Sequence, residues 1–296
     1  MKEISLSKIT TDKITWPALE NNSIGADMLR LDKIHPLVSG NKWFKLRYYL
    51  EEAKQQNKKR VVTFGGAWSN HIIATAAACK LHGFSSTGII RGEKPTVFSE
   101  TLQQAAELGM ELVFISREDY TAKKIPAHLQ SETNYFIQQG GYGATGAKGA
   151  SEILNFCEKE KYTHICCAAG TGTMLAGLSD AALPSQQVIG ISVLKNNFQL
   201  DGDVKKLILN KHTGFSIFHD YHSGGYAKYN NQLIHFINEF YRQTGIPTDF
   251  VYTGKLSFAV ADLVQKDFFP PGSHILLIHS GGLTGNASLK KGLLIF

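Results

Sequence analysis

Lys42 is the residue of this chain with the clearest potential for covalent chemistry. It stands in the run Ser39-Gly40-Asn41-Lys42, which follows the apolar residues 35–38 and lies just ahead of an expected helix. Apolar surroundings disfavour an ammonium ion, so a lysine in such a place presents a free amine that can condense with an aldehyde. Most lysines beside a loop are solvated surface groups, and this alternative stays open from the run alone.

A segment rich in glycine and threonine provides a second candidate site. Gly170, Thr171, Gly172 and Thr173 follow an apolar run and precede a helical pattern. Glycines let backbone N–H groups come close to an anion, and the helix N-terminus adds partial positive charge. The segment lacks the lysine of a nucleoside triphosphate loop and the full dinucleotide pattern, so a single phosphate group fits it best. The alternative is an ordinary turn with Thr173 as the helix cap.

The run Ser69-Asn70-His71 lies at another expected junction between a strand and a helix, after Gly65 and Gly66. Exposed N–H groups, together with the Ser69 and Asn70 side chains, would suit a carboxylate, and an asparagine amide can donate to a phenolate oxygen. Helix capping by Ser69 or Asn70 is the structural alternative. His71 is expected to contact substrate, with a core or capping histidine as its alternative.

Further hydroxyl side chains stand beside glycines late in the chain. Tyr226, the pair Tyr252-Thr253, and Ser280 each lie next to a glycine that permits a tight turn. Buried tyrosines are more often structural than catalytic. Together with a nucleophilic lysine and a phosphate-binding loop, however, these residues indicate a site for pyridoxal 5'-phosphate (PLP). PLP is an aldehyde that carries one phosphate.

Composition and charge argue against several classes of protein. The net charge is +6 and the pI is about 9.0, but the basic residues are scattered in short runs, so we expect no nucleic-acid partner. No apolar stretch reaches the roughly 18 residues that span a bilayer, so we expect no membrane insertion. Cys166 and Cys167 are adjacent in an expected strand, where they would point to opposite faces and form neither a metal site nor a disulfide. Reduced thiols favour a cytoplasmic protein, and no metal is expected.

Short apolar runs rich in β-branched residues alternate with helical patterns along most of the chain. They predict strands at residues 60–64, 86–90, 111–115, 163–168, 187–193 and 274–279, and helices at 71–82, 99–108, 173–183, 231–243 and after Gly254. This alternation predicts an α/β protein whose parallel sheets are covered by helices. Glycine-rich segments fall at the carboxyl ends of expected strands, where open α/β sheets bind ligands. We expect two lobes with a cleft between them.

Taken in order, these segments resemble the ACC deaminase and D-cysteine desulfhydrase branch of the fold-type II, tryptophan synthase β-like PLP enzymes, where ACC is 1-aminocyclopropane-1-carboxylate. The likeness runs from Lys42 through the Ser69 and Tyr252 segments to Ser280, nearly the whole chain. It implies a two-lobed enzyme with PLP in the cleft, each lobe being a mostly parallel sheet covered by helices. The expected large PLP-binding domain comprises residues 1–45 and 156–296, and the small domain comprises residues 46–155. A homodimer is also expected, because the family is usually dimeric or larger.

The resemblance implies roles for the residues near the expected reaction centre. Lys42 would hold PLP through its amine and later move the α-proton of the substrate. Asn70 would hydrogen-bond the ring oxygen of the cofactor. Ser69, with His71 and nearby N–H groups, would bind the substrate carboxylate, and Ser69 would have a possible part in proton transfer.

The resemblance also implies roles for the outer parts of the site. The segment from Gly170 to Thr173 would bind the phosphate. Tyr226 and Tyr252 would face a small amino-acid substrate. Trp68 departs from the family pattern, because a glutamine is common there, and it could reshape the substrate pocket.

Thr253 bears on the choice of substrate. ACC deaminases carry a glutamate at this position beside the pyridine ring, and a carboxylate near the ring nitrogen favours its protonated, strongly electron-accepting form. A hydroxyl from Thr253 or Ser280 would leave that nitrogen largely neutral, which suits β-elimination. We therefore predict α,β-elimination from a small amino acid, with D-cysteine giving pyruvate, ammonia and sulfide. The alternatives are ACC deamination to 2-oxobutanoate and ammonia, and a protein that binds PLP or amino acids without catalysis.

Overall fold

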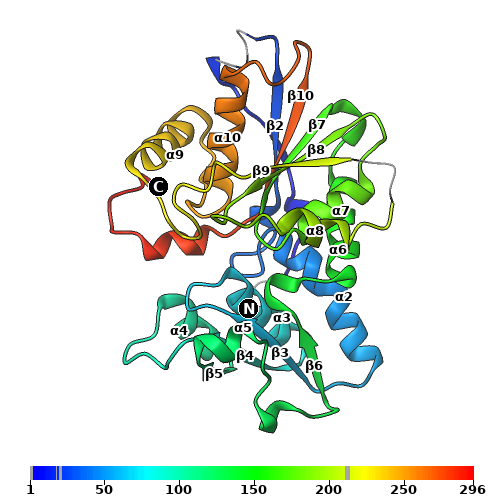
Figure 1. Cartoon of the computed structure of the whole chain (residues 1–296), viewed down its shortest axis with the longest axis vertical. Helices are drawn as coiled ribbons and strands as arrows, with labels where there is room; N and C mark the ends of the chain where they lie inside the picture. Colours follow the sequence, from blue (N-terminus) through cyan, green and yellow to red (C-terminus); the bar gives the residue numbers. More distant parts are fainter. Residues whose placement is uncertain (1–2, 18, 20–21, 211–213) are drawn as a thin grey trace.

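The larger of two sheets contains strands from both ends of the chain. The computed structural model describes residues 3–17, 19, 22–210 and 214–296. This sheet has the strand order β1-β2-β10-β7-β8-β9, with β1 antiparallel to β2 and the other neighbouring pairs parallel. The bounds are β1 (Thr11–Lys13), β2 (Gly25–Arg30), β7 (His164–Ala169), β8 (Gln187–Ser192), β9 (Phe215–Phe218) and β10 (His274–His279). It occupies the upper half of the molecule in Figure 1.

A smaller parallel sheet occupies the lower half of Figure 1. Its strand order is β5-β4-β3-β6, and all its neighbouring strands run parallel. The bounds are β3 (Arg60–Gly65), β4 (Ser85–Arg91), β5 (Met110–Ile115) and β6 (Asn134–Ile137). The two parallel-dominated sheets confirm the expected fold class.

Helices cover both sheets, with α9 and α10 on one side of the larger sheet and α6, α7 and α8 on the other (Figure 1). The α-helices are α2 (Asn41–Gln55), α3 (Asn70–His82), α4 (Glu100–Glu107), α5 (Arg117–Thr121), α6 (Ala144–Ser151), α7 (Thr173–Ala181), α8 (Leu200–Lys205), α9 (Asn231–Thr244) and α10 (Thr253–Gln265). Short 3-10 helices fill connections at Leu6–Lys8, Leu31–Ile34, Ala127–Leu129, Gln139–Gly141, Glu152–Phe156, Lys159–Lys161 and Leu283–Ser288. Within the described residues, no helix combines the length and the apolar character that crossing a membrane requires.

The strands and helices expected from periodic segments are confirmed, with ends that differ by only a residue or two. The start of α2 is a correction, because this helix begins at Asn41 and therefore includes Lys42 in its first turn. Strands β1, β6 and β9 escaped prediction because each is only three or four residues long. Strand β2 escaped prediction because the buried Asp27 interrupts its apolar pattern. In these strands, pairing with neighbours outweighs the local sequence signal.

Strand β7 separates two hydrophobic cores. Ile165 and Cys167 pack into the core under α7, whereas Cys166 and Ala168 pack into the core under α10. This alternation is the period of a strand buried on both faces. The prediction that the adjacent cysteines point to opposite faces is therefore confirmed, and both thiols are unpaired.

Helix α6 packs tightly between α2 and α7. A Cβ on Gly149 would lie 1.8 Å from the Phe44 carbonyl oxygen, and a Cβ on Gly177 would lie 2.4 Å from the Ala147 carbonyl oxygen. Ala147 also belongs to the core of the larger sheet. The domain boundary expected at residue 155 stays a prediction, and from this packing we propose that the small domain ends before α6.

Candidate active site

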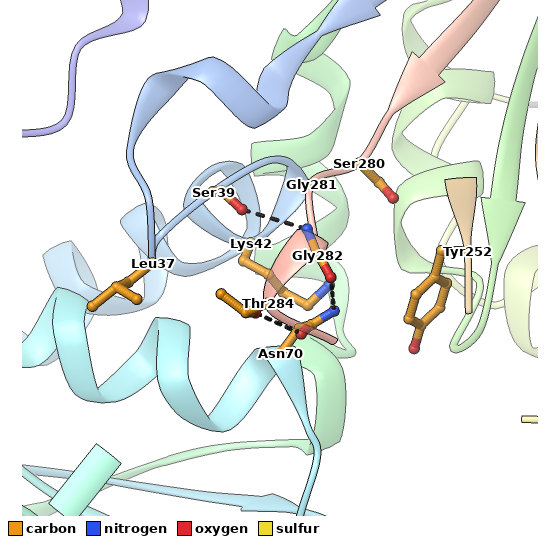
Figure 2. Close-up of a pocket in the computed structure, with 9 residues that line it drawn as sticks. All are labelled: Leu37, Ser39, Lys42, Asn70, Tyr252, Ser280, Gly281, Gly282 and Thr284. Carbon is orange, nitrogen blue, oxygen red and sulfur yellow. Dashed lines mark hydrogen bonds between the residues drawn. The ribbon is translucent and has the colours of Figure 1, made fainter. Parts of the chain in front are cut away.

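A cavity of about 810 Å³ is lined by residues at the carboxyl ends of strands from both sheets. Ser69 and Asn70 follow β3, Gly170 follows β7 and Ser280 follows β10. A recess of about 10 Å³ adjoins the cavity at Lys42 and is drawn in Figure 2. The structure therefore brings together, at strand ends, residues that are far apart in the sequence.

Lys42 lines both the cavity and the recess from the first turn of α2. Its Nζ donates to Asn41 Oδ1 at 2.8 Å and lies 5.8 Å from the centre of the Tyr252 ring. Burial lowers the pKa of Lys42 to about 8, against the opposing attraction of Asp249. About a tenth of the amine is then uncharged at pH 7. This environment supports a nucleophilic lysine.

The turn that presents Lys42 is locked against the end of β10. Gly40 has a φ of +63°, and a Cβ there would lie 1.8 Å from the Ser280 carbonyl oxygen. Gly281 has a φ of +76°, and its Cβ would lie 2.5 Å from Ser39 Oγ. Only glycine combines this conformation with such close approach. The two glycines therefore fix Lys42 relative to the strand end.

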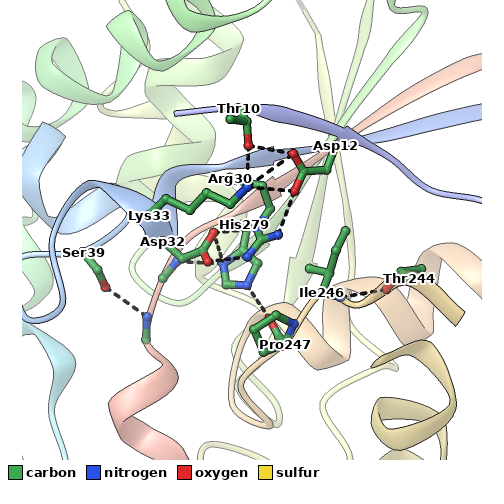
Figure 3. A network of polar contacts seen from close by, with 12 residues as sticks. Thr10, Asp12, Arg30, Asp32, Lys33, Ser39, Thr244, Ile246, Pro247 and His279 are labelled. Atoms are coloured by element: carbon green, nitrogen blue, oxygen red, sulfur yellow. Dashed lines mark hydrogen bonds and ion pairs between the residues drawn. The ribbon is translucent and has the colours of Figure 1, made fainter. Parts of the chain in front are cut away.

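A buried ionic network supports the same end of β10 (Figure 3). His279 accepts a hydrogen bond from the Gly281 N–H at Nδ1 (3.2 Å) and donates from Nε2 to the Pro247 carbonyl oxygen (2.7 Å). Asp32 lies 3.5 Å from His279 Nδ1 and pairs with Arg30 at 2.7 Å. Burial raises the pKa of Asp32, but the hydrogen bond from Arg30 and the positive charge of Arg30 outweigh it and lower the pKa. These contacts therefore hold the turn after β10 in a fixed position.

Ser69 and Asn70 reach the site from the N-terminus of α3. Ser69 caps this helix, because its Oγ accepts a hydrogen bond from the His71 N–H at 3.3 Å, and it also lines the cavity. Asn70 Oδ1 accepts from Thr284 Oγ1 at 3.2 Å, while Asn70 Nδ2 donates to the Gly282 carbonyl oxygen at 3.5 Å. Figure 2 shows these contacts beside Lys42. The amide is thus oriented by contacts with the segment after β10.

His71 is a buried, neutral histidine on the cavity wall. The Thr63 hydroxyl donates to the Ile137 carbonyl oxygen, so its oxygen accepts from His71 Nε2 at 2.8 Å. This assignment leaves Nδ1 unprotonated, and Nδ1 is buried without a hydrogen-bond partner in the described residues. Burial, followed by the charges of Lys42 and Lys45, lowers the pKa of His71 to about 3. His71 can therefore accept a hydrogen bond but does not supply a proton at neutral pH.

Tyr226 and Tyr252 line the cavity together. Their ring centres are 6.1 Å apart and the ring planes meet at 72°. Tyr226 is 44% exposed, so a ligand can reach it. Burial, and next the neighbouring Tyr226, raise the pKa of Tyr252 well above its ordinary value. Tyr252 therefore keeps its phenolic proton and can donate it.

The loop that carries Tyr226 depends on a buried lysine from α10. Lys255 is fully buried, and its Nζ donates to the carbonyl oxygens of His222 (2.7 Å) and Gly225 (2.8 Å). Ser223 in the same loop has a φ of +49°, which is uncommon for a residue with a side chain. The lysine thus holds an unusual loop conformation in place and thereby positions Tyr226.

Replacing Lys255 with methionine is expected to loosen this loop. Two carbonyl groups, that of Gly225 buried and that of His222 partly buried, lose their donor, at about 1–3 kcal/mol for each unsatisfied buried group. We expect the free energy of unfolding in urea to fall by at least about 2 kcal/mol, and the KM for an amino-acid substrate to rise several-fold. The control is Lys266→Met, because Lys266 is 65% exposed and should cost less than about 1 kcal/mol. Equal losses of stability in the two variants would contradict this role of Lys255.

The glycine and threonine segment lines another part of the cavity. Gly170, Thr171 and Gly172 belong to the cavity wall, directly before α7. The first N–H groups of a helix have no acceptors within the helix, so they can bind an anion. Gly140 comes close to this segment, because a Cβ there would lie 2.9 Å from Thr171 Cγ2.

Lys45 is a buried amine next to that segment, and it was not predicted from the sequence. Its Nζ donates to the Gly140 carbonyl oxygen at a distance of 3.5 Å, and the residue is 5% exposed. Burial, followed by the charge of Lys42, lowers the pKa of Lys45 well below its ordinary value. A buried amine with one long hydrogen bond calls for an anionic partner. The available signal was its spacing, three residues after Lys42 on the same helix face.

Asp249 is a second residue of the site that was not predicted from the sequence. It is fully buried, and its carboxylate accepts from the N–H groups of Val251 (3.0 Å), Tyr252 (2.8 Å) and Thr253 (2.9 Å). Burial raises the pKa of Asp249, whereas these backbone hydrogen bonds oppose the shift. Asp249 organises the start of α10, including Tyr252. The available signal was an acidic residue just ahead of a helix.

Two expected cofactor-binding residues lie behind the cavity wall. Thr173 is fully buried, with its Oγ1 3.0 Å from Thr171 Oγ1. Thr253 is fully buried at the start of α10 and does not line the cavity or the recess. Ser280 lines both. Of the two hydroxyls expected to face the pyridine nitrogen, only that of Ser280 belongs to a residue on the wall.

The residues of the cavity fit PLP. The amine of Lys42 suits an aldehyde, and the Gly170 segment with the buried Lys45 suits a phosphate. Asn70 offers an amide beside Lys42 for a ring oxygen. The buried Lys45 amine, with one long hydrogen bond, is the strongest support for a phosphate in this cavity. Burial of a charged amine without a counter-ion is costly, and a phosphate would supply that counter-ion.

The comparisons with known proteins agree with this fit. Residues 4–281 match the family model described as pyridoxal-phosphate dependent enzyme. A Thermotoga maritima protein provisionally named as an ACC deaminase is 31% identical over 282 residues, covering 87% of this chain and 88% of that protein. The Arabidopsis thaliana bifunctional D-cysteine desulfhydrase/ACC deaminase, named as mitochondrial, is 28% identical, covering 84% of this chain and 70% of that protein.

Solved structures show the same relationship. A crystal structure of an ACC deaminase homologue superposes with a TM-score of 0.82 at 26% identity, covering 97% of this chain and 92% of that chain. A hydrogen sulfide-producing enzyme from Fusobacterium nucleatum has a TM-score of 0.64 at 14% identity, covering 92% and 93% of the two chains, and shows the shared fold. The chain therefore belongs to the family of pyridoxal-phosphate-dependent enzymes, and its relatives include proteins named as ACC deaminases and a D-cysteine desulfhydrase.

Proposed function

We propose that this enzyme cleaves a small amino acid by α,β-elimination, with D-cysteine and water giving pyruvate, ammonia and hydrogen sulfide. Its membership of the PLP-dependent family and the similarity to a bifunctional D-cysteine desulfhydrase support the proposal. When bound, PLP supplies an electron-accepting ring that stabilises negative charge at the α-carbon of the substrate.

The residues of this chain would hold the reactants and move the protons. The Lys42 amine would hold the cofactor and, when released, take the α-proton. Asn70 would bind the ring oxygen, and the Gly170 segment with Lys45 would bind the phosphate. The substrate carboxylate would lie at the N-terminus of α3, where Ser69 and Asn70 line the cavity.

Tyr252 is suited to protonate the departing sulfur. It lines the cavity next to Lys42, and its raised pKa keeps the phenol protonated at neutral pH. A thiolate that leaves a partly dry site gains from a nearby proton donor. Tyr226, on the loop held by Lys255, would close the same part of the cavity.

D-Cysteine is favoured over ACC because no carboxylate of the described residues is available at the position expected for the pyridine nitrogen. Asp203 is the one carboxylate among the described residues that line the cavity, and it pairs with Lys206 at 3.0 Å. Ser280, which lines the cavity, would supply a hydroxyl instead. A ring nitrogen beside a hydroxyl stays largely neutral and withdraws electrons less strongly, which is sufficient when a good leaving group departs from the β-carbon.

ACC deamination is the second candidate, because relatives are named for it. ACC has no α-hydrogen, so opening its cyclopropane ring requires a stronger electron sink than a PLP ring with a neutral pyridine nitrogen provides. The names of the relatives support both reactions equally, so the choice between them depends on the chemistry of the cavity.

Product analysis tests the proposal. The purified enzyme loaded with PLP would be given D-cysteine, L-cysteine and ACC separately, with keto acid, sulfide and ammonia assayed together. We expect pyruvate and sulfide in equal amounts from D-cysteine, and 2-oxobutanoate from ACC at less than roughly a tenth of that rate. Faster release of 2-oxobutanoate would favour ACC, and no product from any of the three would contradict the proposal.

The rate at which the apoenzyme captures PLP is expected to follow the titration of Lys42. The free amine is the nucleophile, so with a pKa of about 8 the rate should increase with pH. The increase should be nearly tenfold from pH 6 to pH 7 and no more than about twofold above pH 8. The control is N-acetyl-lysine amide, whose rate should keep increasing to about pH 10. Parallel profiles for the protein and the control would contradict a perturbed Lys42.

A further inference from the structure

A group of polar residues at the small-sheet side of the cavity has no role in the proposed reaction. Arg91 is the last residue of β4, and Tyr120 lies in α5, the helix that follows β5. Both line the cavity, as do Ser69 and Asn70 from the segment after β3. Strand β4 lies between β3 and β5 in the parallel sheet, so these residues share one edge. The group is therefore a continuation of the substrate side of the cavity.

The Tyr120 hydroxyl is a buried donor without a partner. The residue is 9% exposed, and its oxygen makes no hydrogen bond within the described part of the chain. Its ring packs edge-on against Phe64, with the ring centres 5.9 Å apart, which holds the ring in place. Burial raises the pKa of Tyr120 to about 12, with Arg91 acting in the opposite direction and Tyr226 in the same one. The hydroxyl thus stays protonated near Arg91 and near the tyrosine expected to face substrate.

Arg91 places positive charge near this hydroxyl, and Lys123 adds a second cation to the cavity wall. Both line the cavity, and neither forms an ion pair in the described residues. Asp203 provides negative charge on the wall, but it is paired with Lys206. Lys42 and Lys45 are assigned to the cofactor, so the charge of Arg91 and Lys123 is left for another ligand. An unpartnered hydroxyl donor near the Arg91 guanidinium suits a carboxylate, sulfonate or phosphate oxygen.

From this arrangement, we propose that Arg91 and Tyr120 form a subsite for an acidic group at the far end of the substrate side chain. Lys123 adds to its positive charge. The proposal rests on the proposed function and narrows it, because the preferred substrates become amino acids whose leaving group carries an anion. D-Cysteine, with its short neutral thiol, would leave the subsite empty. Elimination from a cysteine thioether with an acidic side chain would likewise consume one water molecule, and the products would be pyruvate, ammonia and the acidic thiol.

The test compares two ligands that differ in one charge. The probes are 3-(carboxymethylthio)propanoate and its carbamoylmethyl analogue, which lack the amino group and therefore bind without reacting. Titration calorimetry on the PLP-loaded enzyme gives the ratio of the two dissociation constants. We expect the acid to bind at least roughly tenfold more tightly, as a charge-assisted hydrogen bond provides. We expect Arg91→Gln to reduce the preference to about twofold and Tyr120→Phe to reduce it partly.

Arg117→Gln is the matched control, because Arg117 is an exposed arginine that begins α5 without lining the cavity. It should keep the preference of the unmodified enzyme. A preference near one in the unmodified enzyme would overturn the proposal, and so would a preference that survives Arg91→Gln.

Elimination assays separate this inference from the proposed function. S-carboxymethylcysteine and S-carbamoylmethylcysteine, each in both enantiomers, would be assayed for pyruvate. A calorimetric preference without pyruvate from any cysteine derivative would support the subsite and contradict the proposed reaction. Pyruvate formed equally well from the acid and the amide, without a calorimetric preference, would support the reaction and contradict the subsite.

Discussion

Replacing Lys42 with alanine is expected to give a folded protein that cannot hold PLP covalently. The variant should lack the visible absorbance band of lysine-bound PLP and lose at least roughly a thousandfold in turnover, because both the anchoring nucleophile and the base that moves the α-proton are removed. Absorbance spectra and pyruvate release would be measured after incubation with excess PLP. The loss should be large because no other lysine occupies the same recess in the described residues.

Lys54→Ala is the control for this experiment. Lys54 lies on the same helix, is exposed, and does not line the cavity. This variant should keep both the absorbance band and the activity. A Lys42→Ala protein that retained substantial turnover would show that another group performs the chemistry assigned to Lys42.

Replacing Gly40 with alanine is expected to disrupt the site through the backbone. The added Cβ would lie 1.8 Å from the Ser280 carbonyl oxygen, so the turn and the end of β10 must move apart. The expected loss of unfolding free energy is about 3 kcal/mol or more, combining left-handed strain with overpacking. Urea unfolding of the apoprotein would measure this loss. The affinity for PLP, measured by absorbance titration, should fall with it because Lys42 and Ser280 are displaced from each other.

Gly272→Ala separates strain from the steric clash. Gly272 has a φ of +82°, and a Cβ there would meet no atom within 4 Å. This control should lose only about 1–2 kcal/mol of stability and keep its affinity for PLP. If the two variants lost equal stability and bound PLP equally well, the contact between Gly40 and Ser280 would not be important for the site.

Much of the fold could be predicted from the sequence because its central strands are apolar on both faces. Strand β7, for example, alternates between two cores and therefore appears as a continuous apolar run. Strands β6 and β9 are short and depend on neighbours distant in sequence, so no local pattern predicts them. The homodimer, the cytoplasmic location and the individual roles of the site residues stay predictions.

The candidate site shows the same division between local and long-range information. Lys42 and Ser69 carry local signals, because a lysine or serine beside a glycine-rich turn is visible in one segment. Lys255 and Tyr120 carry no such local signal, because their roles depend on burial and on contacts with groups distant in sequence. Thr253 shows the opposite case, because a suggestive local motif lies behind the wall and Ser280, not Thr253, lines the cavity.

The position of the cofactor on the chain decides whether Lys42 is the lysine that holds PLP. The PLP-loaded enzyme would be reduced with borohydride, digested, and analysed by peptide mass spectrometry. We expect a phosphopyridoxyl group on Lys42, with Lys45 and Lys255 unmodified. A label on either of those lysines, or none on any lysine, would contradict this assignment.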